Sequence, residues 1–403
     1  MESPPGDHTL LDEARRHHDD IVEVRRQIHR TPELGLTLPR TQATILEALD
    51  GLGLAVTTGE ATTSVVAVLD SGRPGPTTLL RGDMDALPLT EDTGLPFASE
   101  VEHAMHACGH DGHVAMLVGA ARLLAGRRSQ LTGRVVFMFQ PGEEGAGGAR
   151  VMLEEGLLRR FGPVDRAFAL HLTPLLPSGW IGTRAGTLLA SADEFRVVVT
   201  GRGGHASMPH DAVDPVPVAC EIVTALQTMV TRRIAAFDPA VLTIASIRAG
   251  TTFNVIPEVA VLEGTVRAVS DPARREALDG LARVASGIAA AHLCRAEVVP
   301  IEESYPVTVN DADAASRTLT VGREVLGADR VVEMPTPVMG AEDWSYVLQQ
   351  VPGSMAFLGA APAGVEHPAP NHSNRMMIDE QALASGVAMH AAMALAGAAQ
   401  PAR

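Results

Sequence analysis

Five side chains that can bind a metal ion lie within a segment of eight residues, 106–113. They are His106, Cys108, His110, Asp111 and His113. Imidazole, thiolate and carboxylate groups are the usual ligands of zinc and other transition-metal ions in proteins. The segment therefore predicts a metal site, with helix capping and hydrogen bonding by the same residues as the alternative.

A second candidate is the pair Glu143 and Glu144, which follows an apolar stretch at 134–139. In an open α/β sheet, ligands bind beyond the carboxyl ends of the strands, and this pair has that position. Two adjacent carboxylates repel each other unless a cation or a proton separates their roles. One glutamate can thus bind metal while its neighbour acts as a general base. The alternative is a solvated acidic turn.

Three further candidates lie at or after predicted strands. His171 ends an apolar stretch at 166–172, and His372 lies in the polar loop 370–373. Asp83 and Asp85 follow a strand predicted at 78–81. Taken singly, each has an ordinary explanation: a buried core histidine, a turn, or a carboxylate that caps a helix or turn.

These candidates become informative together, because four of the five groups follow predicted strands and the first precedes a helix. Sulfur, nitrogen and oxygen ligands are then available from Cys108, His110, Glu144, His171 and His372. Their number suits two ions that share ligands. Two ions about 3.5–4 Å apart lower the pKa of a bound water and bind a carbonyl oxygen. The sequence therefore predicts a two-metal hydrolytic centre.

The elements that must position these residues alternate between strands and helices. Helices are predicted at 8–30, from apolar residues at helical spacing, at 113–124, and from about Glu380 onward. Strands are predicted at 64–70, 78–81, 134–140, 166–172 and 354–359. This alternation is typical of an α/β domain with a central mixed sheet flanked by helices.

The pattern changes between residues 189 and 302. Strands at 194–200, 241–247, 259–267 and 295–301 and helices at 215–232 and 272–292 follow the order β-α-β-β-α-β of a ferredoxin-like unit. Asp214 and Ser270 precede Pro215 and Pro272, as capping residues do at helix starts. We therefore predict a catalytic domain in two parts, 1–188 and 303–403, with a ferredoxin-like domain, 189–302, inserted between them.

Composition restricts the class of protein. The 403 residues carry a formal net charge of −16, and all 32 basic residues are arginines. Without lysine, Schiff-base enzymes and P-loop phosphate binders are excluded, and the acidic charge argues against a nucleic-acid partner. Three cysteines are too few for a disulfide framework, and no apolar run reaches the roughly 20 residues that span a bilayer. We expect a cytoplasmic protein with no membrane partner.

From about residue 18 onward, the sequence resembles the aminoacylase-like di-metal metallopeptidases. The similar branch holds hippurate hydrolase, N-acyl-amino-acid amidohydrolases and indoleacetyl-amino-acid hydrolases. The resemblance rests on short motifs in family order: TPELG at 31–35, RGDMDALP at 81–88, HACGHD at 106–111, QPGEEG at 140–145, ALHL at 169–172, GGHAS at 203–207, NVIP at 254–257, GTVR at 264–267, GAED at 340–343 and NHS at 371–373.

The resemblance implies roles for individual residues. The two divalent ions, with Zn, Mn, Co and Ni all compatible, would be bound by Cys108, His110, Glu144, His171 and His372.

The resemblance further implies that Glu143 deprotonates the attacking water and returns the proton to the leaving amine, while Asp85 orients a ligand. In the inserted domain, His205 and Asn254 would contact the substrate from the partner subunit, and Arg267 would meet the substrate carboxylate.

The implied reaction is hydrolysis of a small N-acyl-L-amino acid, such as a hippurate-like, N-acetyl or arylacetyl conjugate, to a carboxylic acid and a free amino acid. A dipeptidase or an N-acetyl-diaminopimelate deacetylase would use the same residues. A catalytically silent binding protein is the alternative from another class, and the complete ligand set with Glu143 argues against it. The inserted domain offers an edge strand and a helical face for a homodimer or a higher homo-oligomer.

Overall fold

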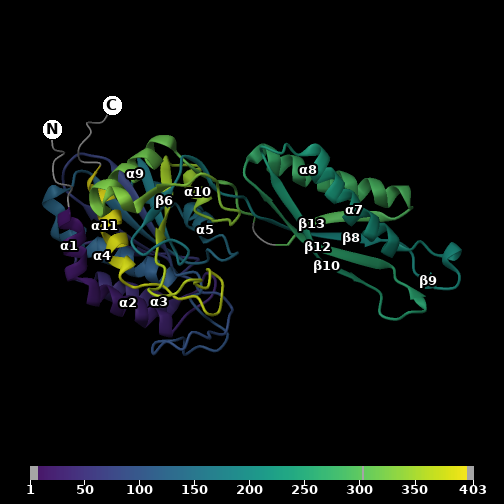
Figure 1. Ribbon diagram of the computed structural model, residues 1–403, viewed down its shortest axis with the longest axis horizontal. Helices are drawn as coiled ribbons and strands as arrows, with labels where there is room; N and C mark the ends of the chain where they lie inside the picture. Colours follow the sequence, from purple (N-terminus) through teal and green to yellow (C-terminus); the bar gives the residue numbers. More distant parts are fainter. Residues whose placement is uncertain (1–7, 302–303, 397–403) are drawn as a thin grey trace. The chain divides into compact units, whose positions relative to one another are not determined.

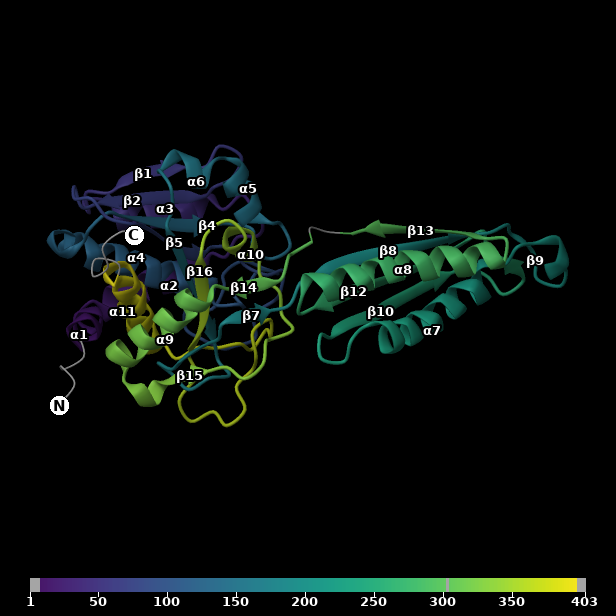
Figure 2. The same ribbon diagram turned by 90° about the horizontal axis from the view of Figure 1, so that it is seen from above.

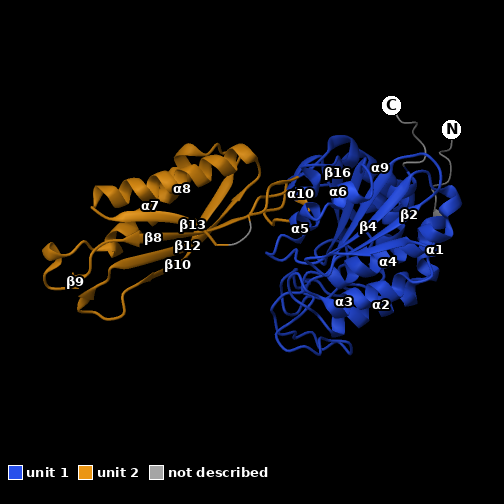
Figure 3. Cartoon of the chain, turned by 180° about the vertical axis from the view of Figure 1, so that it is seen from behind, with its two compact units in different colours: residues 1–188, 309–336, 346–403 blue, residues 189–308, 337–345 orange. Residues whose placement is uncertain are grey.

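The computed structural model describes residues 8–301 and 304–396 (Figure 1). Figure 3 shows that the chain forms two compact units. Unit 1 comprises residues 1–188, 309–336 and 346–403, and unit 2 comprises residues 189–308 and 337–345. Each unit has its own hydrophobic core. The predicted domain boundary between residues 302 and 303 lies outside the described residues.

Unit 1 contains an eight-stranded mixed sheet, and Figure 2 labels most of its strands. Its strands, in order across the sheet, are β1 (Ala55–Thr58), β2 (Val65–Asp70), β4 (Arg134–Gln140), β3 (Thr77–Asp83), β5 (Arg166–Thr173), β16 (Gly353–Gly359), β6 (Ile181–Thr183) and β15 (Val331–Glu333). The central strands β4, β3, β5 and β16 are parallel to one another. Every residue of β3 and β16 is buried, as expected for strands covered on both faces. The predicted mixed sheet flanked by helices is confirmed.

Seven helices of at least seven residues accompany this sheet in the described part of unit 1. They are α1 (His8–Arg16), α2 (His18–Arg30), α3 (Pro39–Leu49), α4 (His110–Gly126), α5 (Gly148–Glu154), α9 (Ala312–Leu326) and α11 (Ala382–Leu395). Shorter helices are α6 (Leu157–Arg160), α10 (Ser345–Leu348), η1 (Arg128–Gln130) and η3 (Ala328–Arg330). Helix α4 is buried over most of its length and packs against α2, α11 and β3.

The predicted single helix at 8–30 is wrong, because the chain turns at His17 between α1 and α2. His17 has φ −98° and ψ 10°, outside the helical range, and its N–H donates to the carbonyl oxygen of Ala14 at 3.2 Å. The apolar periodicity continues across the turn, so that pattern does not reveal it. Helices α3 and α9 were not predicted from the sequence.

Unit 2 contains a four-stranded antiparallel sheet with two helices (Figure 2). In order across the sheet, the strands are β10 (Ala240–Ala249), β12 (Val259–Ala268), β8 (Asp193–Thr200) and β13 (Arg295–Pro300), and the helices are α7 (Pro215–Arg233) and α8 (Asp271–Ala291). Burial alternates along β8 and β12, because helices cover one face of an antiparallel sheet. The predicted caps are confirmed: Asp214 accepts from the N–H of Val216, and Ser270 accepts from that of Ala273.

Short elements complete the described chain. They are the paired strands β9 (Gly204–His205) and β11 (Val255–Ile256), the paired strands β7 (Gly186–Leu189) and β14 (Thr308–Asn310), and the helix η2 (Pro209–Asp211). None of the helices in the described ranges is both long and apolar enough to cross a membrane.

Candidate metal centre

Cys108 lies in the loop that precedes α4, and His110 is the first residue of that helix. Between them, Gly109 has φ 88°, a left-handed conformation that glycine adopts without steric cost. This turn places His110 at the buried start of α4, where its Nδ1–H donates to the carbonyl oxygen of Asp85 at 2.8 Å. The lone pair of the neutral ring is therefore on Nε2. That atom is buried and lies 3.3 Å from Oδ2 of Asp83 and 3.9 Å from Oε1 of Glu144.

His171, near the end of β5, has the same tautomer. Its Nδ1–H donates to the carbonyl oxygen of Leu172 at 2.8 Å, and its Nε2 lies 3.4 Å from Sγ of Cys108. Metal-binding histidines usually donate their other ring N–H to a carbonyl or carboxylate, which fixes the tautomer and the ring orientation. Both His110 and His171 meet this condition.

Glu143 and Glu144 follow β4, and Asp85 fixes their backbone. The carboxylate of Asp85 accepts hydrogen bonds from the N–H of Glu143 at 2.9 Å and from that of Glu144 at 3.0 Å. Asp85 is itself buried after the end of β3. Because β3 and β4 are parallel neighbours, their carboxyl ends lie at the same edge of the sheet, and Asp85 connects the two ends.

His372 comes from a loop far along the chain and reaches the same edge. The backbone N–H of His372 donates to the carbonyl oxygen of Ala107 at 2.8 Å. Its φ is 69°, an uncommon conformation for a residue with a side chain. Its Nε2 lies 3.3 Å from Oε1 of Glu144. The backbone hydrogen bond thus brings His372 beside the loop that carries Cys108.

These side chains form three overlapping sets in which the potential ligand atoms lie within 4.8 Å of one another. The sets are Cys108 with His110 and His171; Cys108 with Glu144 and His372; and His110 with Glu143 and Glu144. Cys108, His110 and Glu144 each belong to two sets. Ligands shared between adjacent sets are what two neighbouring ions require. The structure therefore brings all five predicted ligands together with Glu143 and Asp85.

The charges of these groups favour a cation. Burial raises the pKa of the Cys108 thiol, but His171 and His110 outweigh burial and lower that pKa to about 5. Burial also raises the pKa of Glu144, and its hydrogen bond with His372 reverses the direction and lowers it. Hydrogen bonds to Cys108 and Glu144 raise the pKa of His372 to about 10. Cys108 therefore favours its thiolate form and Glu144 its carboxylate form. A metal ion that binds here would displace protons from the histidines.

His113 supports the centre without being available as a ligand. Its Nδ1 lies 2.5 Å from Oδ1 of Asp83, and its Nε2 accepts from the N–H of Leu172 at 2.7 Å. Both ring nitrogens are therefore occupied, although His113 lies in a fourth close set with Asp83 and His110. Arg81 forms a buried ion pair with the same aspartate at 2.7 Å. Through His113, these contacts connect Asp83 at the end of β3 with Leu172 near the end of β5.

His106 and Asp111, the remaining members of the predicted cluster, belong to no close set of the described residues. Asp111 accepts from Nε of Arg25 at 2.9 Å and pairs with Nδ1 of His29 at 2.7 Å, both from α2. Burial lowers the pKa of His106 to about 3, so its ring is neutral. The segment 106–113 therefore supplies two candidate ligands, and Asp111 anchors it to α2.

In unit 2, His205 and Asn254 lie together in the ladder formed by β9 and β11. His205 pairs with Val255, and the N–H of Ala206 donates to the carbonyl oxygen of Asn254 at 3.1 Å. Nδ1 of His205 accepts from the N–H of Ser207 at 3.1 Å, so the neutral ring carries its proton on Nε2. His205 is exposed and is therefore a potential hydrogen-bond donor at the surface.

Arg267 lies on β12, away from this ladder. It pairs with Val241 near one end of the strand, whereas Val259 at the other end pairs with Thr200, from which the chain continues to β9 (Figure 2). Eight residues at about 3.3 Å each separate Arg267 from Val259 by roughly 26 Å. Unit 2 of one chain therefore does not bring Arg267 and His205 together.

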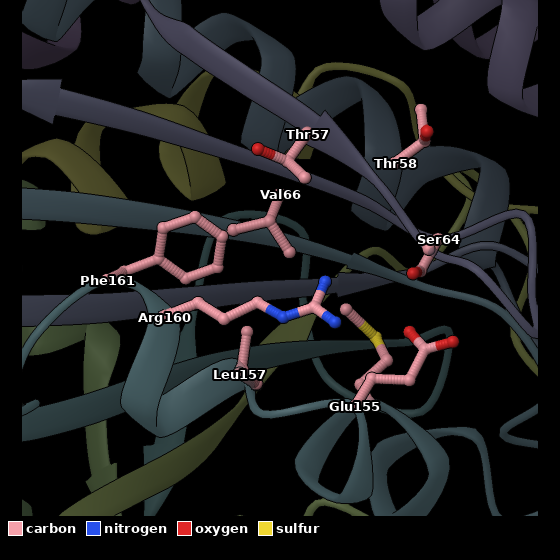
Figure 4. A pocket seen from close by; sticks show the side chains of 10 residues that line it. Thr57, Thr58, Ser64, Val66, Glu155, Leu157, Arg160 and Phe161 are labelled. Carbon is pink, nitrogen blue, oxygen red and sulfur yellow. The ribbon is translucent and has the colours of Figure 1, made fainter.

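A small pocket elsewhere in unit 1 contains none of these residues (Figure 4). Its lining includes Val66, Phe161, Glu155 and Arg160. The carboxylate of Glu155 accepts from the N–H groups of residues 60 and 61, and Arg160 donates to Glu60 at 3.0 Å. Both charged groups of this pocket thus already have partners. The candidate functional site is therefore the group of potential metal ligands at the sheet edge.

Comparisons with known proteins point to one family. Residues 79–396 match peptidase family M20/M25/M40. The chain is 40% identical to IAA-amino acid hydrolase ILR1-like 2 of Arabidopsis thaliana over 380 residues, which cover 94% of this chain and 85% of the relative. It is 38% identical to thermostable carboxypeptidase 1 of Saccharolobus solfataricus over 389 residues, which cover 96% and 97%. The crystal structure of the YxeP protein of Bacillus subtilis, described as a dinuclear metal-binding peptidase from the M20 family, matches with a TM-score of 0.81 at 34% identity and covers 95% of this chain and 98% of that one. The chain belongs to peptidase family M20/M25/M40.

Proposed function

We propose that this chain is a metal-dependent amidohydrolase that cleaves the amide bond of small N-acyl-L-amino acids. The observation that carries the proposal is the presence of Glu143 beside ligand sets that overlap at Cys108 and Glu144. A site that only stores metal needs no extra carboxylate, whereas hydrolysis needs a base beside the attacking water. The name of the Arabidopsis relative, a hydrolase of IAA-amino acids, supports a conjugated amino acid as the substrate class.

Two divalent ions fit the residues present. Three of the potential ligand atoms lie close together, because Oε1 of Glu144 lies 3.9 Å from Nε2 of His110 and 3.3 Å from Nε2 of His372. Nitrogen and carboxylate oxygen atoms gathered in this way are suited to binding a metal ion. The other proposed ligands are Cys108 and His171. When bound, the ions lower the pKa of water and polarise the amide carbonyl. The mixed sulfur, nitrogen and oxygen ligands suit zinc, manganese, cobalt or nickel.

Glu143 is the proposed general base. It takes a proton from the attacking water and gives that proton to the leaving amine. Asp85 is proposed to keep Glu143 and Glu144 at a constant spacing, through its hydrogen bonds to both backbone N–H groups. His205 is the proposed donor to the substrate carbonyl oxygen as negative charge develops there, because its Nε2 carries the proton.

We also propose that residues 189–302 form a ferredoxin-like lid and dimerisation domain, and that residues 1–188 and 303–403 form the catalytic domain. The separation of roughly 26 Å along β12 supports an exchange of residues between subunits, because one small substrate cannot reach both ends of the strand. In the proposed homodimer, His205 and Asn254 of one chain contact the substrate held by the partner subunit. The carboxylate of that substrate is bound by Arg267 of the chain that does not supply this His205.

Hydrolysis of dipeptides is a second candidate function. It is favoured by the relative from Saccharolobus solfataricus, which is named a carboxypeptidase. Both candidates use the same metal ligands and the same base, and they differ in the group attached to the amide carbonyl. All three cysteines of the chain are free, and Cys108 must stay reduced to bind metal, which supports the cytoplasm as the proposed place of action.

The experiment that tests the proposal is hydrolysis of a substrate panel by the purified chain. The panel contains hippurate, N-acetyl-amino acids, indoleacetyl conjugates, N-acetyl-diaminopimelate and dipeptides. We expect cleavage of N-acyl-amino acids that a chelator abolishes and that one of the four ions restores. Undiminished hydrolysis by a metal-free sample would refute the mechanism, and cleavage of dipeptides alone would establish the second candidate.

A further inference from the structure

Asn371 directly precedes His372, and its side chain contacts two other segments that carry candidate ligands, those of Cys108 and His171. Its Nδ2 donates one hydrogen bond to the carbonyl oxygen of Cys108 at 3.0 Å and one to that of Leu172 at 3.1 Å. Leu172 follows His171 in β5. The two N–H groups of one amide therefore connect the segments that carry three of the five proposed ligands.

The surrounding backbone reinforces this connection. The carbonyl oxygen of Leu172 accepts both from Asn371 and from Nδ1 of His171, so one oxygen orients the ring of His171 and receives the amide. The N–H of His372 donates to Ala107, one residue before Cys108. A displaced Asn371 side chain would therefore alter the spacing of Cys108, His171 and His372 together.

We propose that Asn371 is a positioning residue that sets the distances among Cys108, His171 and His372. The inference rests on the proposed function, because that function identifies the three residues as metal ligands. Metal–ligand bonds tolerate deviations of only about 0.2 Å, so small shifts of the segments matter. Removal of a hydrogen bond just outside the ligands commonly lowers metal affinity about 10- to 100-fold. Substitution of Asn371 would leave all five proposed ligands in the chain and would change only the distances among them.

Two substitutions of Asn371 and one matched control test this role. Asn371→Asp keeps the shape but places acceptor oxygens against two carbonyl oxygens, and Asn371→Ala removes the donors without adding charge. The control is Asn310→Asp. Asn310 is a buried asparagine of unit 1 whose Nδ2 donates to the carbonyl oxygens of Arg184 and Met355 at 2.9 and 3.0 Å. Among the described residues, the side chain of Asn310 bonds to Thr183, Arg184 and Met355, none of which is a proposed ligand. The substitution Asn310→Asp thus removes the same kind of interaction away from the metal centre.

The full-length chains are loaded with Co²⁺, and the absorption band of charge transfer from the Cys108 thiolate to cobalt is recorded. Co²⁺ affinity is measured by competition with a chelator, and Tm by calorimetry. We expect both Asn371 variants to show an altered band and an affinity lower by about 10- to 100-fold. We expect Asn310→Asp to lower Tm while the band and the affinity stay those of the wild type.

A wild-type band and affinity in the Asn371 variants would overturn the positioning role. The same holds if Asn310→Asp changes the band as strongly, because the effect would then be a general loss of stability. If Asn371→Asp does not fold, Asn371→Ala decides by the same criteria. A wild-type chain that binds no Co²⁺ through Cys108 would instead overturn the proposed metal centre, so the two failures are distinguishable.

Discussion

Glu143 and Glu144 are adjacent, so substitutions at these two positions can separate the proposed base from the proposed ligand. Glutamine has nearly the shape of glutamate, but its amide is uncharged and cannot act as a base that accepts a proton from water. The backbone N–H groups of both residues would stay bonded to Asp85, at 2.9 and 3.0 Å in the wild type. A difference between the two variants therefore reports on the side-chain carboxylates.

We expect Glu143→Gln to keep both metal ions and to lower kcat about 10²- to 10⁴-fold, the usual contribution of a general base. At 1.36 kcal/mol per tenfold, this corresponds to about 3–5 kcal/mol of barrier. Glu144→Gln is expected to lose metal instead. Glu144 belongs to two of the three overlapping ligand sets, and its Oε1 is buried 3.3 Å from Nε2 of His372.

Metal content per chain is measured by mass spectrometry after dialysis, and kcat and KM are measured on the best substrate of the panel. Glu154→Gln is the matched control, because Glu154 lies on the exposed side of α5 and pairs there with Arg150. It should match the wild type in both measurements. The assignment of base and ligand fails if Glu143→Gln loses metal while Glu144→Gln retains it, or if Glu143→Gln keeps wild-type kcat.

Cys108→Ser should lower the content of both ions in mass spectrometry, because the sulfur belongs to two ligand sets, and full retention would show that the thiolate is not shared. Burial disfavours the charge of His29, but Asp111 outweighs burial and raises the pKa of His29 to about 9. The protonated ring therefore stabilises the fold fully below about pH 6.5, and this stabilisation is lost as the pH rises through about 9. The Tm difference between the wild type and His29→Gln should shrink over that range, and a difference that grows with pH would contradict the ion pair. A mixture of Glu143→Gln and His205→Ala chains under subunit exchange should recover about a quarter of wild-type activity, since half of the dimers are mixed and half of their centres carry neither substitution. No recovery would mean that His205 acts within its own chain.

The strands that carry the metal centre could be predicted from the sequence, because each is a short apolar stretch that ends in polar residues. The strand predicted at 134–140 is β4, and the one predicted at 166–172 lies within β5. Their parallel arrangement places Glu144 and His171 at one edge of the sheet, where α/β proteins bind ligands. The five proposed ligands could therefore be placed together before their distances were known.

The contacts that support the ligands could not be predicted, because they join residues far apart in the sequence. Arg25 and Asp111 are 86 positions apart, and Asn371 and Cys108 are 263 positions apart. No periodic pattern encodes such partners. For the same reason, the sequence alone makes His113 a candidate metal ligand. Only its hydrogen bonds with Asp83 and Leu172 show that both ring nitrogens are occupied.

The order of the proposed ligands along the chain has a consequence for biosynthesis. Cys108, His110 and His171, which make up one complete set, precede unit 2, whereas His372 follows it. About 200 residues separate His171 from His372, and a ribosome that adds 5–20 residues per second needs roughly 10–40 s to synthesise them. During that interval the nascent chain contains every ligand of the first set, whereas the set of Cys108, Glu144 and His372 still lacks His372. Asn371, which contacts the segments of Cys108 and His171, is synthesised together with His372. The proposed geometry of both sets is therefore complete only after the C-terminal part of unit 1 has left the ribosome.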